Sequence, residues 1–395
     1  MKILYICTAF PRNEKDPITP WLVETIKRLR ERGFEIEVFT SSYKGIKQRR
    51  LFSIPICRFR YSFKRFEHLT HDQAVVERLK QGFKFKILVI FYLLSGFLHG
   101  FLMSLRKKYD WIHVHWPFPH GLFSIPFKIF GRSRVVYTFH GAELILAEKS
   151  IFYKFFLRFI NRFAEAITVN SSFTRKKVLK ITSDKPVYIV PFGAAVEPKE
   201  VRNEIGREKE EKRILFVGRL VERKGVKYLI EAIKLLAEKY KNLKLIIVGI
   251  GPDFEYLKHY VKSSDMEKVV VFKGRISSEE LMEEYRNSDV FVLPAIIDSK
   301  GDTEGLGVVL IEAMSFGVPV VASRVGGIVD VVLHEETGLL VEEKNVEELR
   351  DSIERLLVDK ELKMKLIRNA YQHINKNFNW DSILDKLVTI YTTSL

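Results

Sequence analysis

Two glutamates mark the ends of a segment in which a glycine-containing loop leads into an apolar run. Glu304 opens the segment Glu-Gly-Leu-Gly-Val-Val-Leu-Ile-Glu, and Glu312 closes it. The pattern predicts a loop that feeds a helix of about three turns, with Gly317 as the C-terminal cap. A carboxylate at 312 needs partners, because burying it unpaired in so apolar a helix would cost several kcal/mol. Either the two hydroxyls of a ribose or a structural Arg or Lys would serve.

The residues between the two glutamates suit an anion. Gly305, Leu306 and Gly307 precede the predicted helix, where free backbone amides and the helix dipole favour negative charge. A rise of ~1.5 Å per residue puts Glu312 roughly 7–8 Å along the helix from Gly307. That separation is similar to the length from a ribose to the far phosphate of a nucleoside diphosphate. Glu304 would then face the group attached to that phosphate.

A basic loop lies earlier in the chain, in the segment Phe-Val-Gly-Arg-Leu-Val-Glu-Arg-Lys-Gly at 216–225. Gly218 ends a strand-like run, and Arg219 and Lys224 follow it before a helical pattern from about 226. Open α/β sheets bind ligands at the carboxyl ends of their strands, so these two cations could hold a leaving diphosphate. Alone this loop is a weak signal, but followed by the two glutamates it becomes specific.

A third segment, Val-Gly-Ile-Gly-Pro, contains Gly249 and Gly251. Its glycines could form a phosphate-binding turn. They could equally form a tight connection from a strand to a helix, so the segment by itself leaves both interpretations open.

The elements that must position these residues follow an alternating order. Short β-branched runs alternate with longer helical patterns, which predicts parallel sheets covered by helices. Predicted strands of the first half are 2–7, 35–40, 111–115, 134–139, 166–169 and 187–190. Those of the second half are 213–217, 243–248, 269–272, 290–293 and 319–322.

The chain divides between these two sets of strands. With 395 residues, of which 47% are hydrophobic, it can bury two cores. The charged stretch Glu197–Glu211 predicts a linker between a domain at 1–200 and another at 201–375. Within 376–395, a last helix over about 380–392 is expected to pack elsewhere than on its own domain, with the N-terminal domain as the candidate surface.

In combination and order, these motifs resemble glycosyltransferase family 4 over nearly the whole chain. The resemblance continues through Gly326-Gly327 and the segment Thr-Gly-Leu-Leu-Val at 337–341. It implies an α/β GT-B fold with two Rossmann-like parallel-sheet domains facing across a cleft. It also implies a nucleotide-sugar donor in the C-terminal domain, retention of anomeric configuration, and no metal or other cofactor.

The resemblance also implies roles for single residues. Arg219 and Lys224 would hold the diphosphate, Glu312 the ribose and Glu304 the transferred sugar. In the N-terminal half, Asp-Trp-Ile-His-Val-His-Trp (110–116) and Tyr-Thr-Phe-His-Gly-Ala-Glu (137–143) resemble two strand ends of the family. Of these, His140 would lie beside the donor sugar.

Two histidines of the first strand end, His113 and His115, are two residues apart and share a face of that strand. They could be metal ligands, but no third ligand stands at a suitable spacing. A packed or substrate-lining role is therefore favoured.

Two segments depart from the family pattern. The loop after the first predicted strand, at 8–17, has no glycine, so Arg12 is expected to supply charge there instead of backbone amides. After Pro-Phe-Gly at 191–193, the family's usual Asp is absent, and Ala195, Val196 and Glu197 stand in its place. No role is carried over to these positions.

The net charge of +16 is concentrated in residues 1–200, which suggests an anionic partner. Nucleic acid, an acidic membrane or a phosphorylated substrate would fit, as would plain solvated basic faces. Residues 87–105 lack charged side chains, but a membrane span there would split the N-terminal sheet, so a buried or interfacial helix is predicted. Residues 58–66 interleave basic and aromatic side chains, a pattern suited to lipid headgroups or nucleic acid.

The two cysteines, Cys7 and Cys57, have no neighbours at metal-ligand spacing, and the N-terminus lacks the pattern of a secretory signal. Both observations favour a cytoplasmic location.

Together with what the resemblance implies about fold, donor and retention, these observations predict a retaining hexosyltransferase on the cytoplasmic face of an anionic membrane. It would move a sugar from a nucleotide-sugar donor to a saccharide acceptor, in particular a lipid-linked one. A sugar-nucleotide epimerase of the same fold is the alternative enzyme. A basic nucleic-acid-binding protein is the alternative outside enzymes, but it leaves the motifs of the second half unexplained, so nucleic acid is not an expected partner.

Overall fold

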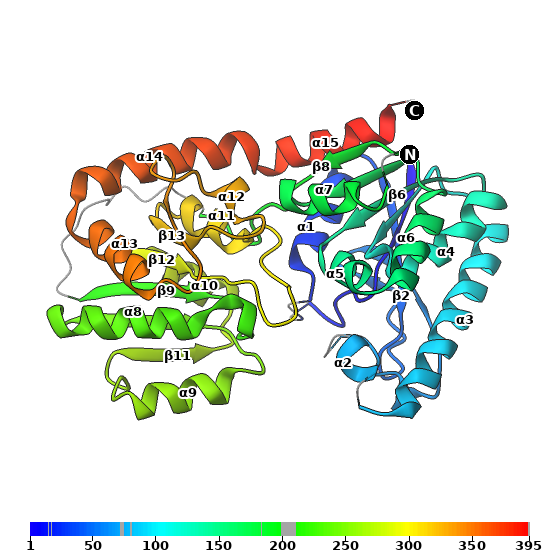
Figure 1. The fold of residues 1–395 in the computed structure, drawn as a ribbon. Coiled ribbons are helices and arrows are strands. Elements are labelled where there is room, and N and C mark those ends of the chain that lie inside the picture. The colour runs from blue at the N-terminus through cyan, green and yellow to red at the C-terminus, as the bar shows by residue number, and fades with distance from the viewer. Residues whose placement is uncertain are drawn as a thin grey trace. The chain divides into compact units, whose positions relative to one another are not determined.

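The computed structural model describes residues 1–393 except 15, 17, 72–74, 80, 183 and 199–210. Its contacts divide the chain into two compact units, and Figure 1 colours the chain from its N-terminus to its C-terminus. Unit 1 contains Met1–Asn170, Thr174–Val190 and Leu384–Leu395, and unit 2 contains Ser171–Phe173 and Pro191–Ile383. The predicted linker Glu197–Glu211 lies almost entirely outside the described residues.

Unit 1 is built on a sheet of eight strands in the order β3-β4-β2-β1-β5-β6-β7-β8, parallel except where β3 pairs with β4. The strands are β1 (Lys2–Ile6), β2 (Glu35–Ser41), β3 (Arg50–Leu51), β4 (Ile54–Phe59), β5 (Trp111–His115), β6 (Arg134–Phe139), β7 (Ala166–Val169) and β8 (Val187–Ile189). All the strands predicted for the first half are confirmed. The apolar pattern does not predict β3 and β4, because β3 is very short and β4 contains Pro55 and Arg58.

Helices connect these parallel strands, as parallel pairing requires. They are α1 (Pro20–Glu31), the 3-10 helix η1 (Lys64–Phe66), α2 (Val75–Leu79), α3 (Phe83–Arg106), α4 (Pro117–Ile129), α5 (Ala142–Lys149), α6 (Ile151–Asn161) and α7 (Ser172–Leu179). α3 packs closely along α4 because Gly96 and Gly100 face Phe123, and a Cβ at Gly96 would overlap the ring of Phe123.

α3 is the one helix among the described residues whose length and composition would suffice to cross a membrane. However, β4 precedes α3 and β5 follows it, and both belong to one sheet, with β2 and β1 between them. A single sheet cannot lie on both sides of a bilayer. The prediction that residues 87–105 do not span a membrane therefore agrees with this topology.

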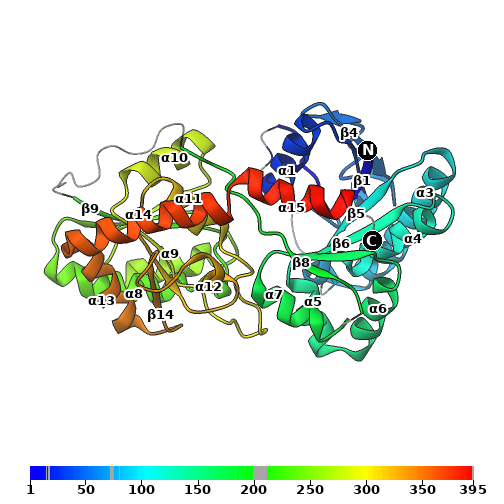
Figure 2. The ribbon, with the colours of Figure 1, turned by 90° about the horizontal axis from the view of Figure 1, so that it is seen from above.

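Unit 2 is built on a parallel sheet in the order β11-β10-β9-β12-β13-β14, seen in a second view in Figure 2. The strands are β9 (Lys212–Val217), β10 (Leu243–Val248), β11 (Val270–Gly274), β12 (Val290–Leu293), β13 (Val320–Ser323) and β14 (Leu339–Val341). The five strands predicted for the second half are confirmed. β14 coincides with a segment that the sequence marks only as a family motif.

The helices of unit 2 are η2 (Glu222–Lys224, a 3-10 helix), α8 (Val226–Lys239), α9 (Phe254–Ser263), α10 (Ser278–Asn287), α11 (Val308–Ser315), α12 (Ile328–Val331), α13 (Val346–Val358) and α14 (Lys360–Asn377). α8 begins where the sequence predicts. The prediction of three turns for α11 is wrong, because the helix has 8 residues, little more than two turns. Gly317, with φ of 69°, ends it as predicted, and the amide of Val318 bonds back to Ala313.

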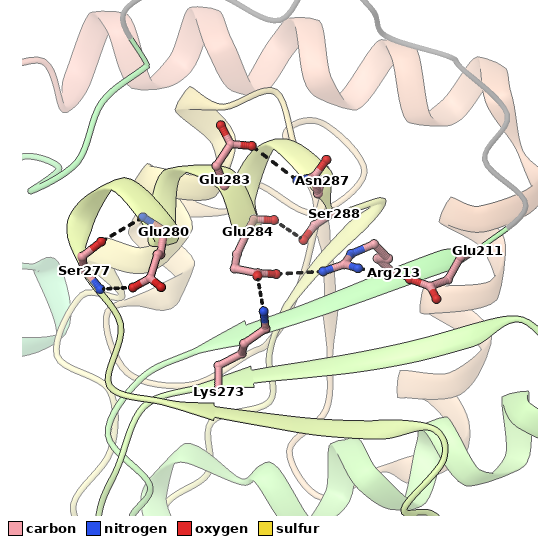
Figure 3. A network of polar contacts seen from close by, with 9 residues as sticks. All are labelled: Glu211, Arg213, Lys273, Ser277, Glu280, Glu283, Glu284, Asn287 and Ser288. Atoms are coloured by element: carbon pink, nitrogen blue, oxygen red, sulfur yellow. Dashed lines mark hydrogen bonds and ion pairs between the residues drawn. The ribbon is translucent and has the colours of Figure 1, made fainter.

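A network of charges fastens α10 to the sheet of unit 2 (Figure 3). The carboxylate of Glu284 accepts a hydrogen bond from Arg213 of β9 at 2.9 Å and pairs with Lys273 of β11 at 3.1 Å. At the start of α10, Ser277 and Glu280 form a reciprocal capping box. Glu280 and Glu284 therefore have structural partners within unit 2.

The predicted last helix is present as α15 (Trp380–Thr392). Its first residue belongs to unit 2, where the indole of Trp380 donates a hydrogen bond to the carbonyl of Ala194 at 3.1 Å. Its end belongs to unit 1, where the hydroxyl of Tyr391 lies 2.9 Å from that of Tyr5 and its carbonyl accepts from Trp111.

Candidate active site

The loop after β9 is held by backbone contacts that only glycine permits. A Cβ at Gly249 would collide with the carbonyl oxygen of Gly218, and one at Gly251 with that of Leu220. The amide of Leu220 also donates a hydrogen bond to Ile250 at 3.1 Å. The Gly-x-Gly segment therefore has a packing role, which favours the tight turn among its two interpretations, and it positions the basic loop.

Two cations of the basic loop converge on one carboxylate. Lys224 forms a short ion pair with Oε2 of Glu304, and Arg223 reaches the same oxygen at 3.2 Å. The side chains of Lys224 and Glu304 are only 9% and 13% exposed, so solvent screens the pair weakly. Burial raises the pKa of Glu304, but the charges of Lys224 and Arg223 outweigh it and lower that pKa to about 2. Glu304 is therefore ionised throughout the neutral range.

A pair of glycines fixes the backbone on which Glu304 stands. The amide of Gly327 donates a hydrogen bond to the carbonyl of Glu304 at 2.9 Å. A Cβ at Gly326 would strike that same carbonyl, and one at Gly327 would strike the carbonyl of Gly305. The Gly-Gly motif thus serves to bring two backbone segments together at the site.

The start of α11 offers backbone donors. Within the described part of the chain, the amides of Gly305, Leu306 and Gly307 donate to no acceptor, and Leu306 and Gly307 are buried. Gly307 has φ of 87° and precedes the helix directly. Buried amides at a helix N-terminus that lack acceptors are suited to bind an anion.

Glu312 is buried in α11 and has partners other than the two expected kinds. Its Oε2 accepts a hydrogen bond from the hydroxyl of Tyr285 at 2.8 Å, and its Oε1 accepts one from the amide of Ala195 at 3.1 Å. Burial raises the pKa of Glu312 to about 7, although these hydrogen bonds act in the opposite direction. Neither an Arg nor a Lys pairs with this carboxylate among the described residues, so the structural cation that the sequence left open is not found.

We expect Glu312→Gln to gain stability relative to the wild-type protein as the pH rises. The pKa of Glu312 is about 7 in the folded protein against an ordinary value of 4.5, so folding favours its protonated form. This stabilisation is complete below pH 4.5 and is lost as the pH rises through 7, by on the order of 3 kcal/mol. Melting curves of the wild type and the variant at pH 5 and pH 8 measure this effect. The Tm of the variant minus that of the wild type should be larger at pH 8 than at pH 5. The exposed Glu336, replaced in Glu336→Gln, is the control, and a difference independent of pH would contradict the expectation.

Arg219 lies apart from this ion pair. Its side chain is exposed, and the described residues offer it no hydrogen bond or ion pair. Arg223, which the sequence analysis did not select, contacts Glu304 instead and lies 3.6 Å from Asp302. The signal for Arg223 was its place next to Lys224 in the same basic loop.

In unit 1, His140 lies among aromatic rings at the carboxyl ends of β5 and β6. Its Nε2 is 3.1 Å from Nδ1 of His115, and its ring stacks on Trp116 with centroids 4.2 Å apart. The ring of Trp21 of α1 lies beside it as well, with the two ring centroids 5.2 Å apart. Burial, together with the nearby His113, lowers the pKa of His140 to about 3. The imidazole is therefore neutral at physiological pH.

His113 is a packed histidine. Its Nδ1 is 2.5 Å from the hydroxyl of Tyr391 and its Nε2 is 2.6 Å from that of Thr138, so both ring nitrogens are engaged. Burial lowers its pKa to about 3. Among the described residues, no group of three or more His, Cys, Asp or Glu side chains is arranged to hold a metal ion.

The loop after β1 carries Arg12, whose guanidinium binds Asp16 through two hydrogen bonds at 2.6 and 3.2 Å. The backbone amide of Arg12 donates to the same carboxylate at 2.9 Å. Asp16 thus neutralises much of the charge that the sequence analysis assigns to Arg12.

Comparison with known families places both halves of the chain. The model described as Glycosyltransferase Family 4 matches residues 21–197, and that described as Glycosyl transferases group 1 matches residues 198–373. The chain belongs to glycosyltransferase family 4. The family matches make it an enzyme and favour neither the epimerase nor the nucleic-acid-binding alternative. Its two parallel-sheet domains form the GT-B fold.

Individual family members resemble the chain to different extents. An uncharacterized glycosyltransferase of Methanocaldococcus jannaschii is 34% identical over 194 residues, which are 49% of this chain and 48% of that relative. This match therefore spans about half the length of the relative. A mannosyltransferase of Mycobacterium tuberculosis is 28% identical over 288 residues, 68% of this chain and 72% of the relative. The solved structure of Anabaena HepE has a TM-score of 0.72 at 20% identity and covers 99% of both chains.

Proposed function

We propose that the enzyme is a retaining hexosyltransferase that moves a sugar from a nucleotide-sugar donor to a hydroxyl of a lipid-linked saccharide. The convergence of Lys224 and Arg223 on Glu304, next to the unpaired amides before α11, is the observation that carries this proposal. The structure of HepE was determined with UDP, which supports a nucleotide-sugar donor. The mycobacterial relative is named a GDP-mannose-dependent phosphatidylinositol monomannoside mannosyltransferase, which supports a lipid-linked acceptor.

The donor diphosphate would bind to Lys224, Arg219 and the amides of residues 305–307. Negative charge grows on the diphosphate as the bond to the sugar breaks, so donors fixed in advance around it lower the barrier. Arg223 would add a further positive charge near the diphosphate, since its contact with Glu304 holds it beside Lys224.

The remaining site residues would recognise the nucleoside and the sugar. Glu312 would accept hydrogen bonds from the ribose through the lone pairs that Tyr285 and Ala195 leave open. Glu304 would hold hydroxyls of the transferred sugar while Lys224 and Arg223 keep its carboxylate oriented. Neutral His140 would donate or accept a hydrogen bond beside the same sugar.

Retention would follow from attack on the face of the sugar that the diphosphate leaves. The bond from the anomeric carbon to the phosphate oxygen breaks, the acceptor oxygen bonds to that carbon, and its proton passes to the departing phosphate. Glu304 is occupied by two cations, which makes it a poor covalent nucleophile and supports this route.

Positive side chains at the diphosphate would also make a metal ion unnecessary. A screen of nucleotide sugars with a saccharide acceptor, measuring release of the free nucleoside diphosphate, tests the donor class. We expect one or a few donors to be turned over at the same rate with and without EDTA, and NMR of the product to show the anomeric configuration of the donor. Activity restored only by Mg²⁺ or Mn²⁺, or an inverted product, would overturn the corresponding part of the proposal.

A lipid-linked acceptor requires the enzyme to work at a membrane. The positive charge of residues 1–200 supports peripheral association with the anionic cytoplasmic face, where each basic residue contributes about 1 kcal/mol. The predicted basic and aromatic segment 58–66 contributes less to this than its composition suggests. Arg58 donates to the carbonyl of Pro11 at 2.6 Å, and Arg60 pairs with the fully buried Glu67 at 2.7 Å.

A further inference from the structure

The side of α3 that faces away from α4 is exposed and apolar along its whole length. Its exposed large side chains recur every three or four residues, as one face of a helix requires. They are Phe83, Ile87, Ile90, Phe91, Leu94, Phe97, Leu98, Leu102 and Leu105. Leu94 is 63% exposed and Phe91 54%. α3 is therefore apolar on both sides, and only one of them is covered by unit 1.

Neighbouring elements enlarge this exposed surface. α4 packs between α3 and α6, as Figures 1 and 2 both show within unit 1. The end of α4 adds Ile129 and Phe130, and the ring of Phe130 contacts Phe101 of α3. α6 adds Ile151, Phe152, Phe155 and Phe159, all exposed. Single exposed apolar residues are common on proteins, but an unbroken apolar stripe such as that along α3 marks an interaction surface.

The three helices that form this surface carry basic side chains and no acidic ones. Residues 78–109, which contain α3, include no Asp or Glu, and neither does α6. Basic side chains stand at both ends of α3, namely Lys84 and Lys86 at its start and Arg106 at its end, followed by Lys107 and Lys108. On α6, Lys154 and Arg158 alternate with the exposed aromatic residues.

These charges favour a lipid surface over a second copy of the chain. In a dimer formed through α3, the ends of the two helices would meet with positive charge on both sides in parallel and antiparallel arrangements alike. No acidic residue of α3 could offset that repulsion. An anionic bilayer instead offers negative headgroups to the basic ends and an apolar interior to the stripe between them.

We propose that α3, the end of α4 and α6 form a membrane-docking face that inserts into the surface of an anionic bilayer. α3 lies parallel to the membrane plane, with its exposed stripe buried about 5–10 Å into the boundary between headgroups and acyl chains and its basic ends among the headgroups. Docking then has an electrostatic part that salt weakens and an apolar part that salt leaves intact. The inference rests on the proposed action at a membrane and names the surface that performs it.

Sedimentation of the full-length protein with liposomes tests this face. Phosphatidylglycerol and phosphatidylcholine in equal parts serve as anionic liposomes, and phosphatidylcholine alone as neutral ones. The variant Phe91→Ser/Leu94→Ser/Leu98→Ser changes three exposed side chains of α3. The variant Tyr256→Ser/Val358→Ser, which changes two exposed apolar residues of unit 2, is the matched control.

We expect the wild type and the control to bind anionic liposomes and to keep part of this binding at high salt. The α3 variant should bind about tenfold or more weakly, with an unchanged Tm because its replaced side chains are exposed. Binding of the α3 variant equal to that of the wild type would overturn the proposal. The proposal would also be overturned if the wild type did not bind liposomes but formed a dimer and the α3 variant were monomeric. The exposed side of α3 would then bind a second copy of the chain.

Nucleotide release with a water-soluble saccharide acceptor separates this proposal from the proposed function. We expect the α3 variant to retain this activity within about twofold, because the changed side chains are exposed and none of them is assigned to the active site. Loss of liposome binding with activity retained supports the docking face. Liposome binding that depends on α3 in a protein without any transfer activity would refute the proposed function and leave the docking face in place.

Discussion

Replacement of Lys224 by alanine is expected to lower kcat for transfer by a factor of about 10²–10³. The change removes one fixed positive charge from the place where the diphosphate leaves, and a loss of that size is typical when one such group is deleted. It also removes the shorter of the two contacts to Glu304, leaving Arg223 alone with that buried carboxylate. Single-turnover measurement of nucleotide release separates this effect from a change in product release.

Lys227→Ala is the matched control for Lys224→Ala. Lys227 follows in the first turn of α8, is 43% exposed and contacts Glu231 at 3.8 Å. We expect its replacement to change the rate by less than about twofold, since an exposed pair of this kind contributes little. Equal and small effects in both variants would show that Lys224 does not serve the leaving group.

The second large effect is expected for Glu304→Gln, which keeps the shape of the side chain and removes its charge. Lys224 and Arg223 would no longer be held by a common partner, and the sugar would lose its hydrogen-bonding carboxylate. We expect kcat to fall by about 10²–10³, with affinity for the free nucleoside diphosphate changed only a few-fold. Selectivity between sugars of one nucleotide should fall as well.

A double-mutant cycle joins these two predictions. Because Lys224 and Glu304 are in direct contact, the combined variant should lose much less activity than the product of the two single losses. Equilibrium binding of the nucleoside diphosphate in all four proteins gives the parallel cycle for ground-state binding. Losses in kcat that simply multiply would mean that the pair does not act as a unit, and a loss confined to nucleotide affinity would place Glu304 outside the sugar site.

Much of the fold follows from local sequence patterns. The strands of both sheets that carry the site are short β-branched runs between polar segments, the pattern of parallel strands buried on both faces, so their positions could be predicted. β4 could not, because Pro55 and Arg58 interrupt its apolar pattern. The length of α11 is overestimated, because the apolar run in the sequence continues beyond both ends of this helix of 8 residues.

The sequence by itself determined which residue types stand at the ends of the strands: the basic loop with Lys224, the glutamates at 304 and 312, and the glycines between them. Only the tertiary structure decided their partners. The amide of Ala195 reaches Glu312 from a distant part of the chain, and Arg223 rather than Arg219 contacts Glu304. These contacts depend on how loops from separate strands pack against each other, which a local sequence pattern does not predict. The same holds for α3, which is apolar on both sides. Only packing against α4 decides that the side with Gly96 and Gly100 is buried and that the side with Phe91 and Leu94 remains exposed.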